Sequence, residues 1–231
     1  MRRTVAVIQA RIGASRLPGK MMLGLHGHPV IEWVYRRVRS SRLLDDVVIA
    51  IPDTRNDDVL AQFITEHLNA NVYRGSEKDV LNRFLGAAKQ VQAQNVVRVC
   101  ADNPLVSGEV IDELIHYFNE HPCDYAYNQG DGGRTNTYPD GFGAEIIPFA
   151  LLEWLDQHAV SERHREHCLT YIVDNPDQFI IRTFNPIDQR IALPCVKVDM
   201  DSLEDYCRLA LKPFSITSSP YDIVQVFSEE Q

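Results

Sequence analysis

The chain has 231 residues, of which 45% are hydrophobic and 24% are charged, and its net charge is −9. These values are those of an ordinary soluble protein with one substantial core, without low-complexity tracts or repeats. No apolar stretch approaches the roughly 20 residues that a membrane-spanning helix needs, and no secretory signal follows Arg2 and Arg3. The sequence therefore predicts a cytoplasmic protein, folded as a single domain over residues 1–231, without membrane insertion.

The first half of the chain alternates apolar, β-branched runs with amphipathic stretches. The runs predict strands at 5–10, 47–51, 70–73 and 96–101, and the amphipathic stretches predict helices at 29–40, 57–68, 79–91 and 109–119. This alternation indicates right-handed βαβ crossovers and a mostly parallel sheet. The predicted fold class is therefore α/β, with three layers (α/β/α), in which ligands bind at the carboxyl ends of the strands.

The second half is less regular. Residues 129–143 are rich in Gly, Asn and Asp, and loops of this length in compact proteins are commonly lids or binding segments. We predict a mobile flap over a bound substrate, because this composition lacks the apolar residues needed to pack firmly by itself. The remaining predicted elements are strands at 124–128, 179–184 and 195–198 and helices at 149–158, 163–173 and 203–211.

A cationic loop, residues 9–20 (QARIGASRLPGK), directly follows the first predicted strand. Its two glycines and one proline shape a tight path in which backbone N–H groups can turn toward one anion. Arg11, Arg16 and Lys20 add the positive charge that complements a triphosphate. The spacing differs from a Walker A loop, and the G-x-G-x-x-G dinucleotide fingerprint is missing, so the sequence argues against P-loop NTPases and nicotinamide or flavin dehydrogenases.

Positive charge is concentrated at the start of the chain. The first 42 residues hold nine Lys and Arg residues against one acid, Glu32, a net charge of +8 that leaves −17 for the rest of a chain whose total is −9. This distribution predicts a field focused on an anionic ligand, and it argues against nucleic-acid binding through an extended basic face. A solvated surface turn is the alternative for the loop considered alone.

Carboxylates follow two of the predicted strands. Asp102 comes directly after strand 96–101, and Asp199 and Asp201 follow strand 195–198. If that last strand continues, Asp199 and Asp201 project to the same face. Carboxylates from two strand ends beside a triphosphate loop are the oxygen ligands that Mg²⁺ prefers. The alternative for Asp201 is a cap at the start of helix 203–211.

Six segments of the chain are recognisable together: IQARIGASRLPGKMM, RGSEKDVLNRF, VVRVCADNPLV, PDGFGAEI, REHCLTYI and VDMDSLEDY. In this order they resemble the cytidylyltransferase family of the spore-coat polysaccharide biosynthesis protein F type, and more distantly the CMP-KDO and acylneuraminate cytidylyltransferases. The resemblance covers about residues 5–210. It implies a Rossmann-like nucleotide-diphosphosugar transferase fold, in which a hydroxyl of a sugar or sugar acid attacks the α-phosphate of CTP and pyrophosphate leaves.

The resemblance also implies roles for individual residues, with a nucleotide-binding half at about 1–106 and an acceptor-binding half at about 107–231. The residues implied on the nucleotide side are Ala10, Arg11, Gly13, Ser15, Arg16 and Lys20. Arg16, Lys20 and Asp102 are the expected catalytic residues, and Mg²⁺ is the expected cofactor, held by Asp102 with Asp201. The family mostly has Asp-Thr-Pro-Glu-Asp at this place. Here Ser202 and Leu203 replace Thr-Pro, and Asp199 offers a second carboxylate, so either Asp199 or Asp201 is the metal ligand.

Other assignments stay open at this stage. Arg74 and Arg83 either contact the nucleotide or form surface ion pairs with Glu77 and Asp79. The acceptor-side residues implied by the family motifs are Glu145, Arg165, Glu166 and His167. A glycosyltransferase that consumes a nucleotide sugar and a non-catalytic nucleotide-binding subunit are the alternative functions. The identity of the acceptor, and whether the protein is a monomer or a homodimer, stay undecided.

Overall fold

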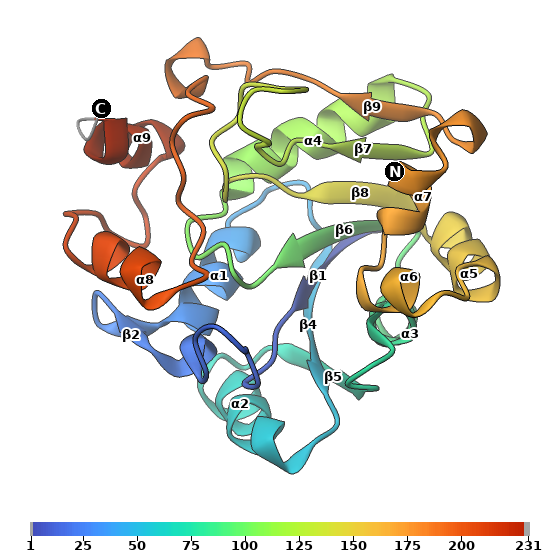
Figure 1. Ribbon diagram of the computed structural model, residues 1–231, viewed down its shortest axis with the longest axis horizontal. Coiled ribbons are helices and arrows are strands. Elements are labelled where there is room, and N and C mark those ends of the chain that lie inside the picture. The colour runs from blue at the N-terminus through green and yellow to red at the C-terminus, as the bar shows by residue number, and fades with distance from the viewer. Residues whose placement is uncertain (1, 229–231) are drawn as a thin grey trace.

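The structure, a computed structural model, describes residues 2–228 and is built around a seven-stranded sheet (Figure 1). The strands lie in the order β5-β4-β1-β6-β8-β7-β9, and within this sheet β8 alone runs antiparallel to its neighbours. This confirms the mostly parallel α/β fold. The strands of the sheet are β1 (Thr4–Gln9), β4 (Asp46–Pro52), β5 (Asn71–Gly75), β6 (Asn95–Cys100), β7 (Tyr125–Tyr127), β8 (Glu145–Pro148) and β9 (Ile181–Thr183).

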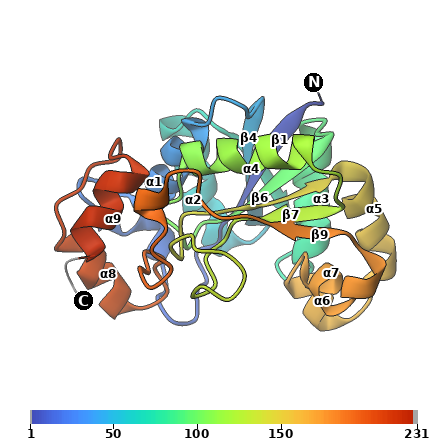
Figure 2. The ribbon, with the colours of Figure 1, turned by 90° about the horizontal axis from the view of Figure 1, so that it is seen from above.

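Helices cover both faces of the sheet (Figure 2). The central strand β1 explains why: Ala6 and Ile8 are buried in the core on one face, while Val5 and Val7 are buried on the other. One face carries α1 (Val30–Arg39), α2 (Asp58–Gln62), α4 (Gly108–Glu120), α8 (Leu203–Ala210) and α9 (Pro220–Ser228). The other face carries α3 (Val80–Gln90), α5 (Phe149–His158) and α7 (Thr170–Asp174).

Smaller elements complete the fold. A short hairpin, β2 (Gly24–Leu25) with β3 (His28–Pro29), precedes α1, and a turn of π-helix, η3 (Phe63–His67), extends α2. The remaining short helices are η1 (Lys20–Met22), η2 (Arg55–Asp57), α6 (Glu162–Glu166), η4 (Pro176–Gln178) and η5 (Gln189–Ile191). Within the described residues, no helix has the length and apolarity required to cross a membrane.

Two predicted elements are wrong. The helix expected at 163–173 is two helices, α6 and α7, because the backbone leaves the helical region at His167 (φ −110, ψ 78). The strand expected at 195–198 is one isolated bridge between Lys197 and Asp140, since no strand of the described part of the chain lies beside it to extend a ladder. The sequence analysis also did not predict β8, α9, the short hairpin of β2 and β3, or the short helices η1, η2, η4 and η5. β8 has four residues and is inserted between β6 and β7 by distant pairing, which local periodicity does not encode.

The segment 129–143 is a loop, as predicted, and although it is poor in apolar residues, it packs against the rest of the protein. Tyr138 and Phe142 are fully buried in the core. The buried Asn136 amide donates to the Gln129 carbonyl (2.9 Å) and to Thr183 Oγ1 (3.1 Å), which ties the loop to β9. Exposed residues are confined to the tip, 132–135. Movement of the segment as one flap stays a prediction, and it would have to begin at this tip.

Candidate active site

The cationic loop leaves the carboxyl end of β1 and has a defined shape. The buried Asp57 carboxylate accepts a hydrogen bond from the Ile12 N–H (2.8 Å), and the Gly19 N–H donates to the Ile12 carbonyl (3.0 Å). Gly19 has a φ of +73°, a left-handed conformation that suits glycine. The loop is therefore held from both ends, unlike a free surface turn. No pattern in the sequence indicated that Asp57 takes part.

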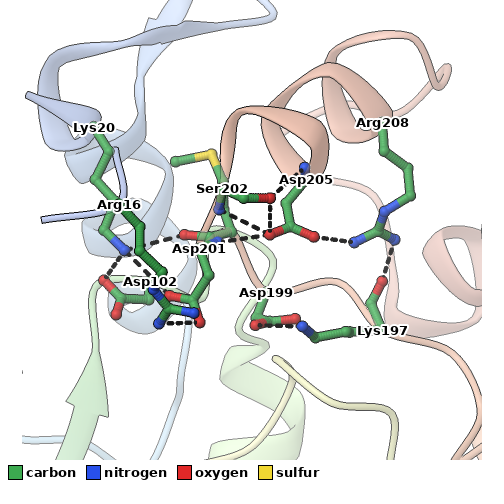
Figure 3. A network of polar contacts seen from close by, with 10 residues as sticks. Arg16, Lys20, Asp102, Lys197, Asp199, Asp201, Ser202, Asp205 and Arg208 are labelled. Atoms are coloured by element: carbon green, nitrogen blue, oxygen red, sulfur yellow. Dashed lines mark hydrogen bonds and ion pairs between the residues drawn. The ribbon is translucent and has the colours of Figure 1, made fainter. Parts of the chain in front are cut away.

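Lys20 lies at the centre of the site, with only 5% of its surface exposed (Figure 3). Its Nζ contacts Asp102 Oδ1 at 2.7 Å and Asp201 Oδ1 at 3.5 Å, and it donates to the Met200 carbonyl at 3.1 Å. The Met200 N–H in turn donates to the Asp102 carbonyl at 2.8 Å. The loop after β1, the end of β6 and the segment before α8 therefore meet at one ammonium group.

Arg16 reaches the same cluster from the outside. Its Nη2 lies 2.7 Å from Asp201 Oδ2, and the Arg16 side chain is 70% exposed. An ion pair this exposed contributes little to stability, because water and salt screen it. Arg16 can therefore exchange the carboxylate for a phosphate at small cost.

These groups border a cleft of about 210 Å³. The cleft brings together most of the predicted site residues: Ala10, Arg11, Ser15, Arg16, Lys20, Arg83, Asp102, Glu166, His167 and Asp201 line it. The others, Gly13, Arg74, Glu145, Arg165 and Asp199, do not line it. Ion pairs explain why four of these five side chains lie outside the lining: Arg74, Glu145, Arg165 and Asp199.

Two arginines outside the lining are committed to ion pairs. Arg74 pairs with Asp53 (3.1 Å) and Asp58 (2.7 Å). The alternative that Arg74 pairs with Glu77 or Asp79 is therefore wrong. Arg165 pairs with Asp79 and with Asp156, at 2.7 and 2.6 Å, and so ties α6 to the start of α3. Arg83, by contrast, lines the cleft, donates to backbone carbonyls and leaves its buried Nε without a hydrogen-bond partner among residues 2–228.

The structure separates Asp199 from Asp201. Asp199 is 9% exposed, its Oδ2 lies 3.3 Å from Lys197 Nζ, and its Oδ1 has no hydrogen-bond partner among the described residues. Burial raises the pKa of Asp199 above its ordinary value. The helix-cap alternative for Asp201 is also wrong, because Ser202 caps α8 and forms a capping box with Asp205. Asp201 is left to face the cleft.

Asp102 and Asp201 fit a divalent cation. Both contact the single Lys20 ammonium, so the two carboxylates converge closely enough for one cation to lie between them. Within residues 2–228 no group of three or more His, Cys, Asp or Glu residues could hold a metal. Mg²⁺ is usually bound by one or two carboxylates together with substrate phosphates and water. The donor set therefore suits a metal that arrives with a nucleotide, rather than one held by protein alone.

The floor of the cleft contains residues that sequence reasoning missed. Arg98 forms an ion pair with Glu145, and its Nε donates to Gln9 Oε1 at 2.8 Å. Glu145 also accepts from Tyr125 Oη (2.5 Å), so it lies behind the cleft lining and contacts it through Arg98. The available signal was a charged residue inside the otherwise apolar strand VVRVC. Burial raises the pKa of the neighbouring Cys100 to about 11, which keeps that thiol protonated and unreactive at neutral pH.

A Rossmann-like α/β sheet with a cationic loop after β1, one carboxylate after β6 and a second before α8 is typical of a nucleotidyltransferase. The sequence profile of the family described as Cytidylyltransferase matches residues 5–192, which is most of the chain. The protein belongs to the cytidylyltransferase family, and this confirms the resemblance found in the sequence.

Individual relatives agree with this membership. The chain is 30% identical over 205 residues to the spore coat polysaccharide biosynthesis protein SpsF of Bacillus subtilis, covering 87% of this chain and 82% of the relative. It superimposes on a cytidylyltransferase of Leptospira borgpetersenii with a TM-score of 0.87 and 27% identity, over 100% and 95% of the two chains.

Two further structures share the fold. One is a CMP-KDO synthetase complexed with CTP (TM-score 0.66, 18% identity, 90% and 97% covered). The other is a Mycobacterium tuberculosis protein in complex with manganese (TM-score 0.63, 15% identity, 91% and 98% covered). At these identities the likeness concerns the fold alone.

Proposed function

We propose that this protein transfers the cytidylyl group of CTP to a hydroxyl of a sugar or sugar acid, with release of pyrophosphate, in the biosynthesis of a surface polysaccharide or glycoconjugate. The observation that carries the proposal is the contact of buried Lys20 with both Asp102 and Asp201, beside the exposed Arg16. The family relatives, SpsF above all, support the reaction class and the pathway class.

Transfer of this kind is a displacement at phosphorus. The acceptor hydroxyl loses its proton to water as its oxygen bonds to the α-phosphorus, the bond from that phosphorus to the bridging oxygen breaks, and pyrophosphate leaves with the electron pair. Such a reaction depends on positioning and on charge neutralisation more than on covalent participation of the protein. Arg11, Ser15 and Arg16, exposed residues that line the cleft, would hold the phosphates. Lys20 and Arg16 would neutralise the charge that accumulates on the leaving group.

Mg²⁺ is the cofactor that we propose, and when bound it supplies Lewis-acid polarisation of the phosphate oxygens. Asp102 and Asp201 would hold it, because they face the cleft from two separate segments and already share one cation, the Lys20 ammonium. Lys20 would keep the two carboxylates together and compensate their repulsion before the nucleotide binds.

The acceptor would enter between the phosphate loop and α6. Glu166 and His167 line this side of the cleft, at the end of α6, and Arg98 lies on the floor. Arg98 offers a planar donor to an acceptor carboxylate or hydroxyl, and Glu145 and Gln9 fix its direction. We therefore assign Glu145 a positioning role through Arg98.

Pyrophosphate release from each of the four NTPs, over a panel of sugars, sugar acids and polyol phosphates, tests the proposal. We expect release with CTP that depends on both a divalent cation and an acceptor, together with a CMP-linked product. A glycosyltransferase would instead consume a nucleotide sugar and release a nucleotide. A non-catalytic subunit would bind CTP and release nothing. Either result would replace the proposed function.

Arg16→Lys is expected to lower kcat as well as weaken CTP binding. Lysine keeps the charge but loses the two-pronged donor, so we expect a loss of roughly 1.5–3 kcal/mol in transition-state stabilisation. Steady-state kinetics at saturating CTP measures this. If the variant kept the wild-type kcat and only KM rose, Arg16 would bind the ground state and the transition state equally well. We would then withdraw the proposal that Arg16 assists the departure of pyrophosphate.

Asp199→Asn is expected to reduce turnover less than tenfold, because Asp199 pairs with Lys197 and does not line the cleft. Asp201→Asn serves as the comparison under the same conditions. A larger loss at Asp199 than at Asp201 would reverse the choice of metal ligand between them.

A further inference from the structure

A second cavity of about 540 Å³ lies where the end of α1, the start of α4 and the segment before α9 meet. It is larger than the cleft and shares no lining residue with it. The three segments approach closely: a Cβ on Gly108, the first residue of α4, would collide with Ser40 and with the backbone of Ser41. The volume lies within the roughly 300–1,000 Å³ that is usual for small-molecule sites.

The lining of this cavity is basic. Its charged residues are four arginines and two carboxylates: Arg36, Arg37, Arg39, Arg42, Glu109 and Asp112. The sequence suggested that the cations of the first 42 residues serve one anion site beside β1. The structure divides them, because these four arginines lie away from the cleft.

Arg37 is the buried member of this set, with 5% of its surface exposed. Its Nε donates to the Val106 carbonyl (2.8 Å), and its Nη1 donates to the carbonyls of Ile216 and Ser218 (3.1 and 2.9 Å). No carboxylate among the described residues forms an ion pair with it. Burial lowers the pKa of Arg37 to about 10, against the raising effect of Glu109, so the side chain stays charged at neutral pH. A buried charge without a counter-ion in direct contact is costly.

Neither nearby carboxylate forms an ion pair with Arg37 within the described residues, although Glu109 acts on its charge without direct contact. Asp112 accepts hydrogen bonds from Ser41 Oγ (2.5 Å) and from the N–H groups of Arg42 and Leu43, which fixes the turn after α1. Arg36 is paired with Glu32. Arg39 and Arg42 are exposed and form no ion pair within the described part of the chain.

Stabilisation of the α1 dipole is the simpler explanation for arginines in its last turn. It accounts for Arg36 and Arg39, but not for Arg37, which turns away to the carbonyls of other segments. It also leaves unexplained a cavity bordered by both the buried and the exposed guanidinium groups. The Arg37 Nη2, which donates to no carbonyl among the described residues, and the forks of Arg39 and Arg42 border one cavity, and such donors match the geometry of a phosphoryl group.

We propose that this cavity is a second anion site, which binds the phosphoryl group of a phosphorylated small molecule through Arg37, Arg39 and Arg42. The phosphoryl group could belong to free pyrophosphate, a nucleotide or a sugar phosphate, and these three sources share the chemistry that the arginines recognise.

Isothermal titration calorimetry in EDTA, with pyrophosphate, CMP and glucose 1-phosphate as separate probes, tests this site. Arg11→Ala with Arg16→Ala weakens the cleft and isolates the second site, since both side chains are exposed. In that background we expect at least one probe to bind, and the tightest probe identifies the source. Adding Arg39→Ala with Arg42→Ala should weaken that binding at least tenfold.

The matched control adds Arg55→Ala with Arg182→Ala instead, which removes the same charge from exposed positions outside both cavities. It should bind the probe within twofold of the background protein. Arg37→Lys, which keeps the charge and loses the fork, should weaken binding without removing it. Binding of no probe, or an equal loss in the control, would overturn the proposal. These readouts are independent of catalysis, so failure of the proposed enzyme function would not affect them.

Discussion

Asp102→Asn and Asp201→Asn should each lower turnover a hundredfold or more, which corresponds to about 2.7 kcal/mol or more of lost transition-state stabilisation. Each change removes one of the two carboxylates that we assign to the metal and leaves Lys20 with a neutral neighbour. The fold should survive, because the Asp102 side chain is 45% exposed and Asp201 is partly exposed. Steady-state kinetics across a Mg²⁺ titration, with circular dichroism as the check on folding, measures both effects.

The control for these variants is Asp58→Asn. Asp58 is an exposed carboxylate that pairs with Arg74 outside the cleft, so turnover should stay within twofold of wild type. A natively folded Asp102→Asn protein with full activity would exclude Asp102 as a metal ligand. A loss of activity that extra Mg²⁺ partly restores would favour weakened metal binding over loss of a direct contact to the nucleotide.

Glu145→Gln should destabilise the fold by about 3 kcal/mol, the lower end of the range for breaking a buried ion pair. Glu145 is 6% exposed and is the ion-pair partner of Arg98, so its neutralisation leaves the Arg98 charge without compensation. Urea unfolding at constant pH measures the change in the free energy of unfolding. We also expect a raised KM for the acceptor with little change in the KM for CTP, because Arg98 lies on the cleft floor.

Tyr125→Phe is the matched control for Glu145→Gln. It removes the hydrogen bond from Tyr125 Oη to Glu145 but keeps the ion pair, so the expected loss is about 1 kcal/mol. Equal losses in the two variants would show that the Glu145 charge adds nothing beyond its hydrogen bonds. If the KM for CTP changed more than the KM for the acceptor, we would assign Arg98 to nucleotide binding and not to acceptor binding.

The parallel half of the sheet was predictable because its signals are local. Each buried strand is a continuous apolar run, and each connecting helix repeats its apolar residues at helical spacing. The same local signals located the loop after β1 and Asp102 after β6. Parallel neighbours end at one edge of a sheet, so their meeting at Lys20 followed from the predicted fold.

Other features depended on contacts between distant segments. Whether Asp199 or Asp201 faces the cleft depends on the path of a segment that has no strand beside it, and an assumed strand periodicity gave the wrong geometry. β8 exists because it fits between β6 and β7, and its four residues carry no strong signal alone.

The amino-acid sequence by itself determined the class of protein, the parallel part of the sheet and the loop after the first strand. These features follow from periodicity and from motifs a few residues long. Tertiary structure alone decided which charges meet. It paired Arg98 with Glu145 across 47 residues, and it placed Arg37 against carbonyls about 180 residues away. Charge interactions depend on distance and burial in space, and neither quantity is encoded in the spacing of residues along the chain.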